Sequence, residues 1–376
     1  MNGKRVGCLV RDGLVLFVAV AFVIVLVETF CQSSVRSDKY VHVVVDKGMT
    51  FSQITQRFEE SGLVRNGLIF KVLGRAFRIE HRAKAGRYRF VPTASMASIL
   101  RALYRGATFR EQIVIAPGRR LEQIAEVLAR TAAVDSTEFV RLARDSAFVA
   151  SLGVPAGTAD GFLLPETYDI EWREEPPSVL ERMVKSFFAV FDDSLRTRAS
   201  ELGMTVRDVV TLASIIEKEA YLESEKPKIS AVFHNRLRIG MKLQADPTVR
   251  FALGKWRGGL RYSDLKIVSP FNTYLFYGLP PSPICNPGRA SLYAALFPQE
   301  ESRALFFVAQ GDGSHAFTLD GRAHERAKTR YKAFLDSLRT AAGIDSLVRA
   351  GAIDSARAVV VMDSLKASKL SGRQTR

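Results

Sequence analysis

The pattern of apolar and polar residues predicts a membrane-targeting segment near the N-terminus. Leu14–Val27 is an unbroken apolar run that follows Arg11 and two further basic residues. A membrane-spanning helix needs about 20 residues, and the apolar residues on both sides extend the run towards that length. Because no A-x-A-like cleavage site follows, we interpret residues 13–31 as an uncleaved anchor rather than as a cleaved signal peptide. The basic residues ahead of the run predict a single-pass protein of the inner (cytoplasmic) membrane, with residues 1–12 in the cytoplasm and the chain after about Cys31 outside it.

A strand–turn–helix pattern then occurs twice, with an offset of seventy residues. Val43–Val45 is a strand-like apolar run that precedes a glycine and a helical spacing of apolar residues, and Ile113–Ile115 begins the same pattern again. Between the copies, Ala85–Phe90 alternates as a strand does, and Met96–Tyr104 has helical periodicity. Small modules of this kind are usually binding or spacing units.

The chain changes character at the proline-broken loop Gly161–Tyr168, where we expect a domain boundary. Three long helical patterns follow, at about Pro177–Leu202, Thr205–Tyr221 and Lys226–Ile239. The next stretch, Gln244–Pro298, is too rich in Pro, Gly and Asn to be regular throughout, and long irregular segments tend to carry binding or catalysis. From about Ala333 the tail repeats an Asp-Ser motif every nine residues, which indicates a helical or partly disordered extension.

Charge is the one feature of the composition that bears on partners. The chain has 376 residues, a formal net charge of +15 and a pI near 9.9. Such a charge predicts an anionic partner, which can be nucleic acid, acidic lipid headgroups or a wall polymer. The sequence has no run of five basic residues, no zinc-knuckle spacing and no RNP-like motif, so nucleic acid is not expected as a partner.

Motif spacing argues against several classes of enzyme. The three cysteines are too few and too scattered for a disulfide framework or a metal site, and the five histidines lack H-E-x-x-H or any other ligand spacing. We therefore expect neither a metal nor another cofactor. The sequence has no P-loop, no G-x-G-x-x-G after a strand and no G-x-S-x-G elbow, which argues against nucleotide-binding enzymes and serine hydrolases.

The second of the three predicted helices carries an unusual carboxylate. Thr205 followed by Asp208 resembles a capping box at the start of the helix, and Val209–Ile216 is apolar nearly all round, as in a buried helix. Glu217 follows this stretch and has mostly small neighbours on its side of the helix. Glu219 points the opposite way, so the two carboxylates are not expected to work as a pair, and we expect Glu219 to be solvated.

Two roles for Glu217 are open at this point. Apolar surroundings disfavour the charged form of a carboxyl group, which raises its pKa and lets it donate a proton near neutral pH, as glycosidic cleavage requires. The alternative is structural, in which Glu217 ends a buried helix and forms an ion pair with Lys218, Lys226 or an arginine. The helix alone does not decide between them.

Several motifs in one order favour the catalytic role. They are Leu212–Glu219, Asn235–Leu237, Leu243–Val249, Asn272–Tyr274, Leu279–Ile284 and Asn286–Gly288, with Ala85–Tyr88 upstream and Phe307–Phe317 downstream. Together they resemble the YceG-like family, from about Val41 to Tyr331. The chain departs from the family at Ser282, where the family usually has glycine, and in the tail after Ala333.

The resemblance implies a lytic transglycosylase that acts on peptidoglycan, with Glu217 as its catalytic residue. In that chemistry one carboxylic acid protonates the glycosidic oxygen between MurNAc and GlcNAc, then takes a proton from the C6 hydroxyl while a 1,6-anhydro ring closes. The resemblance also implies endolytic cutting and LysM-like modules in the upstream repeats. The partners to expect are peptidoglycan glycan strands, inner membrane lipid and peptidoglycan synthases.

Five further residues are candidates for contacting the glycan. Gln244, Asn272 and Tyr274 offer hydrogen bonds and a stacking face for N-acetyl sugars, although ordinary loop structure also accounts for such residues. Glu166 and Asp246 are the only persuasive second carboxylates, and their alternative roles are loop capping and turn formation before a proline. Because a hydrolase of the usual kind needs a second carboxylate, a hydrolytic muramidase stays an alternative. A membrane-anchored peptidoglycan-binding protein without activity is the other.

The predicted fold class is α+β. A transmembrane helix at 13–31 precedes a LysM-like repeat region at 40–158, a mainly helical catalytic domain with long substrate-binding loops at 159–332, and a helical or disordered tail at 333–376.

Overall fold

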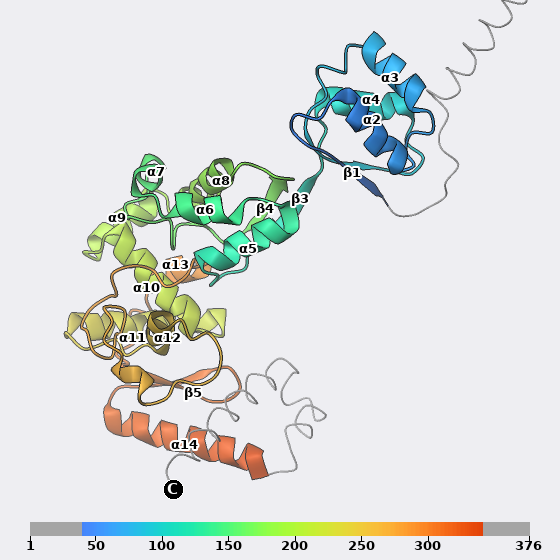
Figure 1. The fold of residues 1–376 in the computed structure, drawn as a ribbon. Helices are drawn as coiled ribbons and strands as arrows, with labels where there is room; N and C mark the ends of the chain where they lie inside the picture. Colours follow the sequence, from blue (N-terminus) through green and yellow to red (C-terminus); the bar gives the residue numbers. More distant parts are fainter. Residues whose placement is uncertain (1–39, 341–376) are drawn as a thin grey trace, which may run out of the picture. The chain divides into compact units, whose positions relative to one another are not determined.

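The computed structural model describes residues 40–340, with side chains as far as Leu335. The predicted anchor at 13–31 and the tail beyond 340 lie outside the described residues. Between residues 40 and 340, no helix is both long and apolar enough to cross a membrane. The described chain is a mixed α+β structure, mostly helical, with small two-stranded sheets (Figure 1). It divides into two compact units, the first comprising residues 40–113, 130–134 and 168–174 and the second the remainder.

The first unit is built on an antiparallel pair of strands. β1 (Val41–Val45) pairs with β2 (Gly86–Phe90), with Val43 opposite Tyr88. The helices of this unit are α2 (Phe51–Glu60), α3 (Gly67–Ala76) and α4 (Met96–Arg105). Their amphipathic faces meet in a core that contains Phe58, Phe70 and Tyr88, because the apolar residues recur at helical spacing on each helix. The predicted strand at Ala85–Phe90 and helix at Met96–Tyr104 are confirmed.

The strand–turn–helix pattern is present at both predicted positions. In the second copy, β3 (Arg110–Val114) is followed by α5 (Leu121–Ala132), α6 (Ser136–Ala143) and the short α7 (Ser146–Ser151). β3 forms a two-stranded sheet with β4 (Thr167–Glu171), just as β1 does with β2. Each copy is therefore a strand, helices and a closing strand.

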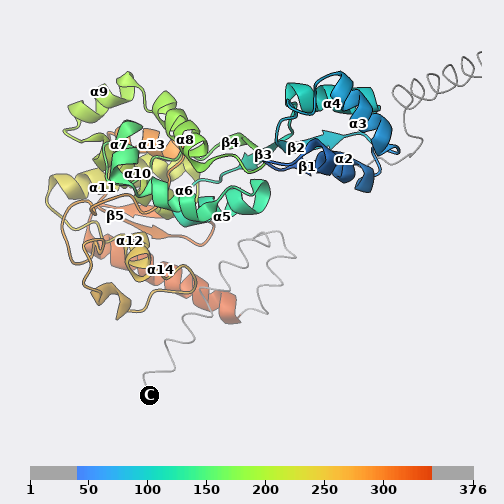
Figure 2. The ribbon, with the colours of Figure 1, turned by 45° about the horizontal axis from the view of Figure 1, so that its top comes forward.

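The second unit is helical around α10. Besides most of α5 and the whole of α6 and α7, its helices are α8 (Pro176–Val190), α9 (Asp193–Glu201), α10 (Val206–Glu219), α11 (Lys226–Arg238), α12 (Asp246–Leu253), α13 (Arg289–Leu296) and α14 (Gly321–Thr340), with short 3-10 turns at Glu223–Glu225 and Asp264–Lys266. A hairpin of β5 (Phe306–Ala309) and β6 (His315–Thr318) precedes α14. α10 packs against α11, α12 and α13, and both views show it between α13 and α11 (Figures 1 and 2). The helix with Glu217 is thus the centre of this unit.

One sequence prediction for this unit needs correction. The continuous helix predicted at 177–202 is two helices, because Asp192 has an extended backbone and its side chain caps the N-terminus of α9 by accepting from Ser194 and Leu195. The stretch 244–298 is, as predicted, not regular throughout, and two short helices, α12 and α13, lie at its ends. The residues between them, from 254 to 288, are irregular apart from the 3-10 turn at Asp264–Lys266.

Candidate active site

α10 brings Glu217 to the centre of the second unit. The predicted capping box is confirmed, since the Thr205 Oγ1 accepts from the Asp208 N–H at 3.1 Å and the Asp208 carboxylate accepts from the Thr205 N–H at 3.0 Å. Every residue of Val209–Ile216 is buried, so the helix is anchored on all sides and its last turn is fixed. Glu217 lies in that last turn, with its side chain only 10% exposed.

Three donors converge on one oxygen of the Glu217 carboxylate. Oε2 accepts from the Ser291 hydroxyl at 2.6 Å and from the Gly288 N–H at 3.0 Å, and the Lys226 ammonium lies 3.4 Å from it. Gly288 caps the N-terminus of α13, where N–H groups and the helix dipole favour an anion. Within residues 40–340, Oε1 accepts no hydrogen bond. One carboxylate oxygen is therefore fixed, and the other is available for proton transfer.

The Lys226–Glu217 ion pair is the contact that the structural alternative for Glu217 anticipated. It is present, and both side chains are nearly buried, at 7% and 10% exposed. An ion pair and a catalytic role do not exclude each other here, because Lys226 contacts only Oε2. Ser291 was not anticipated. It lies outside every motif quoted above, and nothing in its local sequence distinguishes it from a serine in any amphipathic helix.

Asn286 holds the loops around this carboxylate together. Its buried side chain accepts from the N–H groups of Gly161 and Leu163, at 2.9 and 3.0 Å, and donates to the carbonyl of Arg119 at 3.0 Å. Its backbone carbonyl also accepts from Gly118 at 2.9 Å. Three segments far apart in the sequence meet at this one side chain, two residues before Gly288. The position of the Gly288 N–H relative to Glu217 depends on these bonds.

The hairpin of β5 and β6 supports the start of the helix whose lysine contacts Glu217. Glu225 immediately precedes Lys226, and its buried carboxylate accepts from the backbone N–H of His315 at 3.0 Å and contacts His315 Nδ1 at 2.7 Å. His315 belongs to the downstream motif noted in the sequence. The hairpin thereby fixes the beginning of α11 and, with it, the backbone of the lysine that reaches Glu217.

The prediction that Glu219 is solvated is wrong. Glu219 is partly buried beside Asp246, and burial, followed by the charge of Asp246, raises the pKa of Glu219 to about 8. Arg236 and Arg250 oppose this rise without cancelling it. Helical periodicity did predict that Glu219 faces away from Glu217. It could not predict that the segment around Asp246, far along the chain, covers that side of α10.

Three of the predicted substrate-contacting residues lie together at this covered end. The Tyr274 hydroxyl donates to Asp246 Oδ1 at 2.6 Å, and Arg236 Nη1 donates to Gln244 Oε1 at 3.4 Å. Burial and the neighbouring Asp246 raise the pKa of Tyr274, so its hydroxyl keeps its proton. Gln244 and Asp246 are exposed, and their contact with substrate stays a prediction.

The other two predicted residues have different surroundings. Asn272 is fully buried, and its amide donates to the carbonyls of Leu265 and Ile267 and accepts from the N–H of Tyr274. Those bonds match the loop-structural interpretation of this residue. Glu166 is partly exposed and pairs with Arg289 at 2.8 Å. Because Arg289 directly follows Gly288, this ion pair lies beside the residue that binds Glu217.

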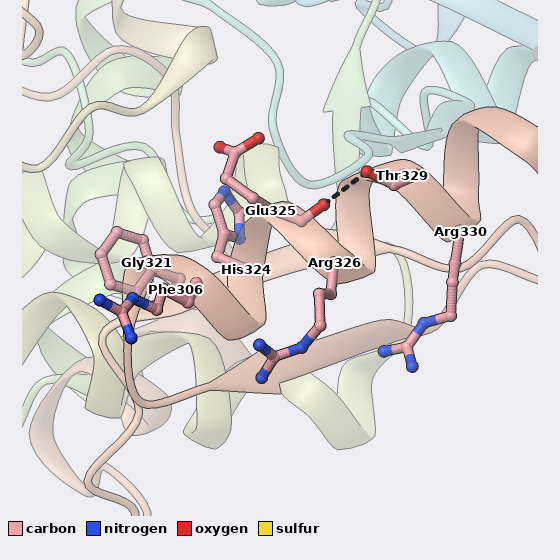
Figure 3. Close-up of a pocket in the computed structure, with 8 residues that line it drawn as sticks. Phe306, Gly321, His324, Glu325, Arg326, Thr329 and Arg330 are labelled. Atoms are coloured by element: carbon pink, nitrogen blue, oxygen red, sulfur yellow. Dashed lines mark hydrogen bonds between the residues drawn. The ribbon is translucent and has the colours of Figure 1, made fainter.

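A separate cavity of about 940 Å³ lies along α14 (Figure 3). Phe306, Arg322, His324, Arg326 and Arg330 are among its lining residues. Figure 3 shows Arg326 and Arg330 extending from one side of α14. None of the residues predicted from the sequence to form the site lines this cavity, so it is distinct from the Glu217 site.

Comparison with known proteins shows the family to which this sequence is similar. The sequence profile of the YceG-like family matches residues 43–330. A protein of Bacillus subtilis (strain 168) named endolytic murein transglycosylase is 30% identical over 309 residues, which are 77% of this chain and 84% of that protein. A protein of the same name from Streptococcus pneumoniae serotype 2 is 26% identical over 336 residues, and the matched region is 80% of this chain and 60% of that relative. A crystal structure of a yceG-like protein from Listeria monocytogenes superposes with a TM-score of 0.55 at 30% identity, covering 77% of this chain and 99% of that one.

Proposed function

The chain belongs to the YceG-like family, and we propose that it is an endolytic murein transglycosylase. In this proposal the substrate is the glycan strand of peptidoglycan, and the bond cleaved is the one between MurNAc and GlcNAc. The product carries a 1,6-anhydro-MurNAc end. Support comes from the relatives named for this activity and from a sheltered carboxylate inside the region that the family profile matches.

The proposed mechanism rests on one observation, the unequal surroundings of the two Glu217 oxygens. Oε2 has three donors, whereas Oε1 has none within residues 40–340. A proton on Glu217 therefore resides on Oε1, because Oε2 is already occupied by donors. Glu217 donates this proton to the glycosidic oxygen, and the leaving sugar departs with its new hydroxyl.

The fixed donors then stabilise the charge that develops on Glu217. When Oε1 loses its proton, the negative charge spreads over both oxygens. Lys226, Ser291 and the N-terminus of α13 are already in position at Oε2 to stabilise it, without reorganisation. The carboxylate next accepts the proton of the C6 hydroxyl through Oε1. The C6 oxygen bonds to C1, which closes the anhydro ring, restores the acid and consumes no water.

The setting that we propose is the outer face of the inner membrane. The apolar run at 13–31 would anchor the chain as a single-pass protein with residues 1–12 in the cytoplasm. We propose that the LysM-like region, 40–158, binds glycan strands, and that the anchored enzyme terminates the elongation of nascent strands beside peptidoglycan synthases. The net charge of +15 suits both acidic lipid and anionic wall polymers.

Digestion of purified peptidoglycan by the full-length chain tests the proposed reaction. We expect 1,6-anhydro-MurNAc ends, detected by mass spectrometry, and their loss in a Glu217→Gln variant. Glutamine keeps the acceptor for Ser291 and Gly288 but cannot donate an acidic proton. Glu223→Gln is the matched control, because Glu223 is exposed and near the same end of α10. Reducing MurNAc ends would instead identify a hydrolytic muramidase, and strand binding without product would identify a binding protein.

A further inference from the structure

The exposed edge at Gln244 and Asp246 presents two polar groups in fixed orientations. Both side chains are exposed, whereas Leu243 and Ala245, which alternate with them, are buried. This segment covers the end of α10 that carries Glu219, two residues beyond Glu217. The edge is therefore close along α10 to the proposed catalytic residue, and it belongs to the same unit.

Gln244 is held in an uncommon backbone conformation. Its φ is 51°, in the left-handed region that residues other than glycine rarely adopt. Bonds to Thr273 keep it there, since the Gln244 N–H donates to the Thr273 carbonyl at 3.0 Å and the Ala245 N–H donates to the Thr273 hydroxyl at 2.9 Å. Strained residues that are exposed and fixed by their neighbours are found preferentially at functional sites.

The orientation of the Gln244 amide follows from its neighbour. Arg236 can only donate hydrogen bonds, so the amide oxygen, Oε1, faces it at 3.4 Å. The amide nitrogen, Nε2, then points away from Arg236 and has no acceptor among the described residues. Gln244 thus offers a donor at the surface.

Asp246 offers an acceptor for a similar reason. The Tyr274 hydroxyl donates to Oδ1 at 2.6 Å, and Oδ2 has no partner within residues 40–340. Burial raises the pKa of Tyr274, so the hydroxyl remains a donor. Burial and the charge of Asp246 raise the pKa of Glu219 to about 8, which favours the protonated form of this neighbouring carboxyl group near neutral pH.

We propose that this edge binds the 2-acetamido group of a sugar in the glycan strand, with Gln244 Nε2 donating to its carbonyl oxygen and Asp246 Oδ2 accepting from its N–H. The proposal rests on the proposed function. The N–H and C=O of a trans secondary amide point in opposite directions, so their partners must stand on either side of the group. Ala245, between the two residues, has an extended backbone. The Cα atoms of Gln244 and Asp246 are therefore separated by about 6–7 Å, which suits partners on either side of a planar amide.

Binding of two neutral tetrasaccharides tests the recognition of the acetamido group. The full-length Glu217→Gln chain binds without cleaving, and its affinities for chitotetraose and cellotetraose are measured by calorimetry. The two sugars share β-1,4-linked rings, but each ring carries an acetamido group at C2 in chitotetraose and a hydroxyl at C2 in cellotetraose. Each hydrogen bond accounts for roughly fivefold in affinity, so we expect chitotetraose to bind at least about 20-fold more tightly. Equal affinities for the two sugars would refute the proposal.

An isosteric exchange tests the two residues. In Gln244→Glu with Asp246→Asn, Arg236 and Tyr274 still take one oxygen each, so the outward groups become an acceptor at 244 and a donor at 246. Size and net charge are conserved, and residues 40–158 are the same in both chains, so the exchange alone should lower the preference for chitotetraose at least about fivefold. The control exchanges are Gln299→Glu and Asp193→Asn, both at exposed positions, which should leave the preference intact. An unchanged preference in the Gln244/Asp246 exchange would refute the assignment.

These outcomes distinguish a failure of the proposed reaction from a failure of the proposed acetamido site. If wild-type chain releases no anhydro ends but the preference for chitotetraose depends on Gln244 and Asp246, the proposed reaction fails and the acetamido site stands. If anhydro ends are released and the exchange leaves the preference unchanged, the reaction stands and the acetamido site fails.

Discussion

The Glu219→Gln variant should become more stable relative to the wild type as the pH rises. In the folded chain, burial first and then Asp246 raise the pKa of Glu219 from its ordinary value of 4.5 to about 8. Between these two values the folded state binds more protons than the unfolded state. The free energy of unfolding of the wild type therefore falls as the pH rises through this window, by at most about 1.4 kcal/mol per pH unit from this group. Glutamine has the shape of the protonated acid and does not titrate.

The size of the effect follows from these two values. With a pKa of 4.5 in the unfolded chain and about 8 in the folded chain, linkage gives a loss of about 2.5 kcal/mol between pH 5 and pH 7. Glu219 is partly exposed, and solvent screening makes this an upper value. The stability difference, Glu219→Gln minus wild type, should thus increase by up to about 2.5 kcal/mol over this range.

Urea unfolding followed by the fluorescence of Trp256 measures this difference in the relevant unit. The chain has two tryptophans, Trp172 and Trp256, and only Trp256 lies in the second unit, so the measurement uses a Trp172→Phe background. Other titrating groups cancel because wild type and variant are compared at each pH. Glu223→Gln, at an exposed position, should give a difference that does not vary with pH. A constant difference for Glu219→Gln between pH 5 and pH 7 would show that Glu219 ionises freely and refute the reasoning.

The remaining predictions concern the surroundings of Glu217. Lys226→Met removes a charged contact to Glu217 Oε2. The kcat/KM for the release of anhydro ends should fall roughly 10- to 100-fold, and Lys226→Arg should restore part of it. Ser291→Ala removes the 2.6 Å bond to the same oxygen. It should lower kcat about tenfold with little change in KM, because the bond acts on charge that develops in the transition state; a change in KM alone would contradict this. Asn286→Ala removes three buried side-chain hydrogen bonds. The free energy of unfolding of the second unit, measured with urea, should fall by about 3 kcal/mol. An unchanged urea midpoint would contradict the role of Asn286 in joining the loops.

Local sequence signals predicted the elements that depend on local physics. The capping box of Thr205 and Asp208 predicted the start of α10, and the apolar run after it predicted a buried helix. Strand alternation and helical spacing likewise located β2 and α4 within a residue or so. In these cases hydrogen bonds between neighbours in the chain, or one apolar face, decide the conformation, so the pattern is sufficient.

Contacts between distant segments could not be predicted in the same way. Ser291 lies in a helix some seventy residues from Glu217, and its role depends on how α13 packs against α10. The break at Asp192 depends on a cap that competes with helix continuation, and apolar periodicity does not record that competition. The burial of Glu219 could not be predicted from α10 alone, because Asp246, which lies beside it, begins α12, far along the chain. The ordered motifs did draw attention to Gln244, Asp246 and Tyr274, and the structure brings these three residues together.

The two carboxylates at the end of α10 illustrate how one rigid helix can assign opposite tasks to neighbouring residues. Residues two positions apart in an α-helix differ by about 200° in direction, so Glu217 and Glu219 face different elements. Glu217 faces an ammonium, a hydroxyl and a helix N-terminus, all of which stabilise a negative charge. Glu219 is partly buried and faces Asp246, and burial, followed by the charge of Asp246, favours the proton on Glu219. In the mechanism that we propose, Glu217 exchanges a proton with the sugar, whereas Glu219 lies beside Asp246 at the edge that we propose binds the acetamido group.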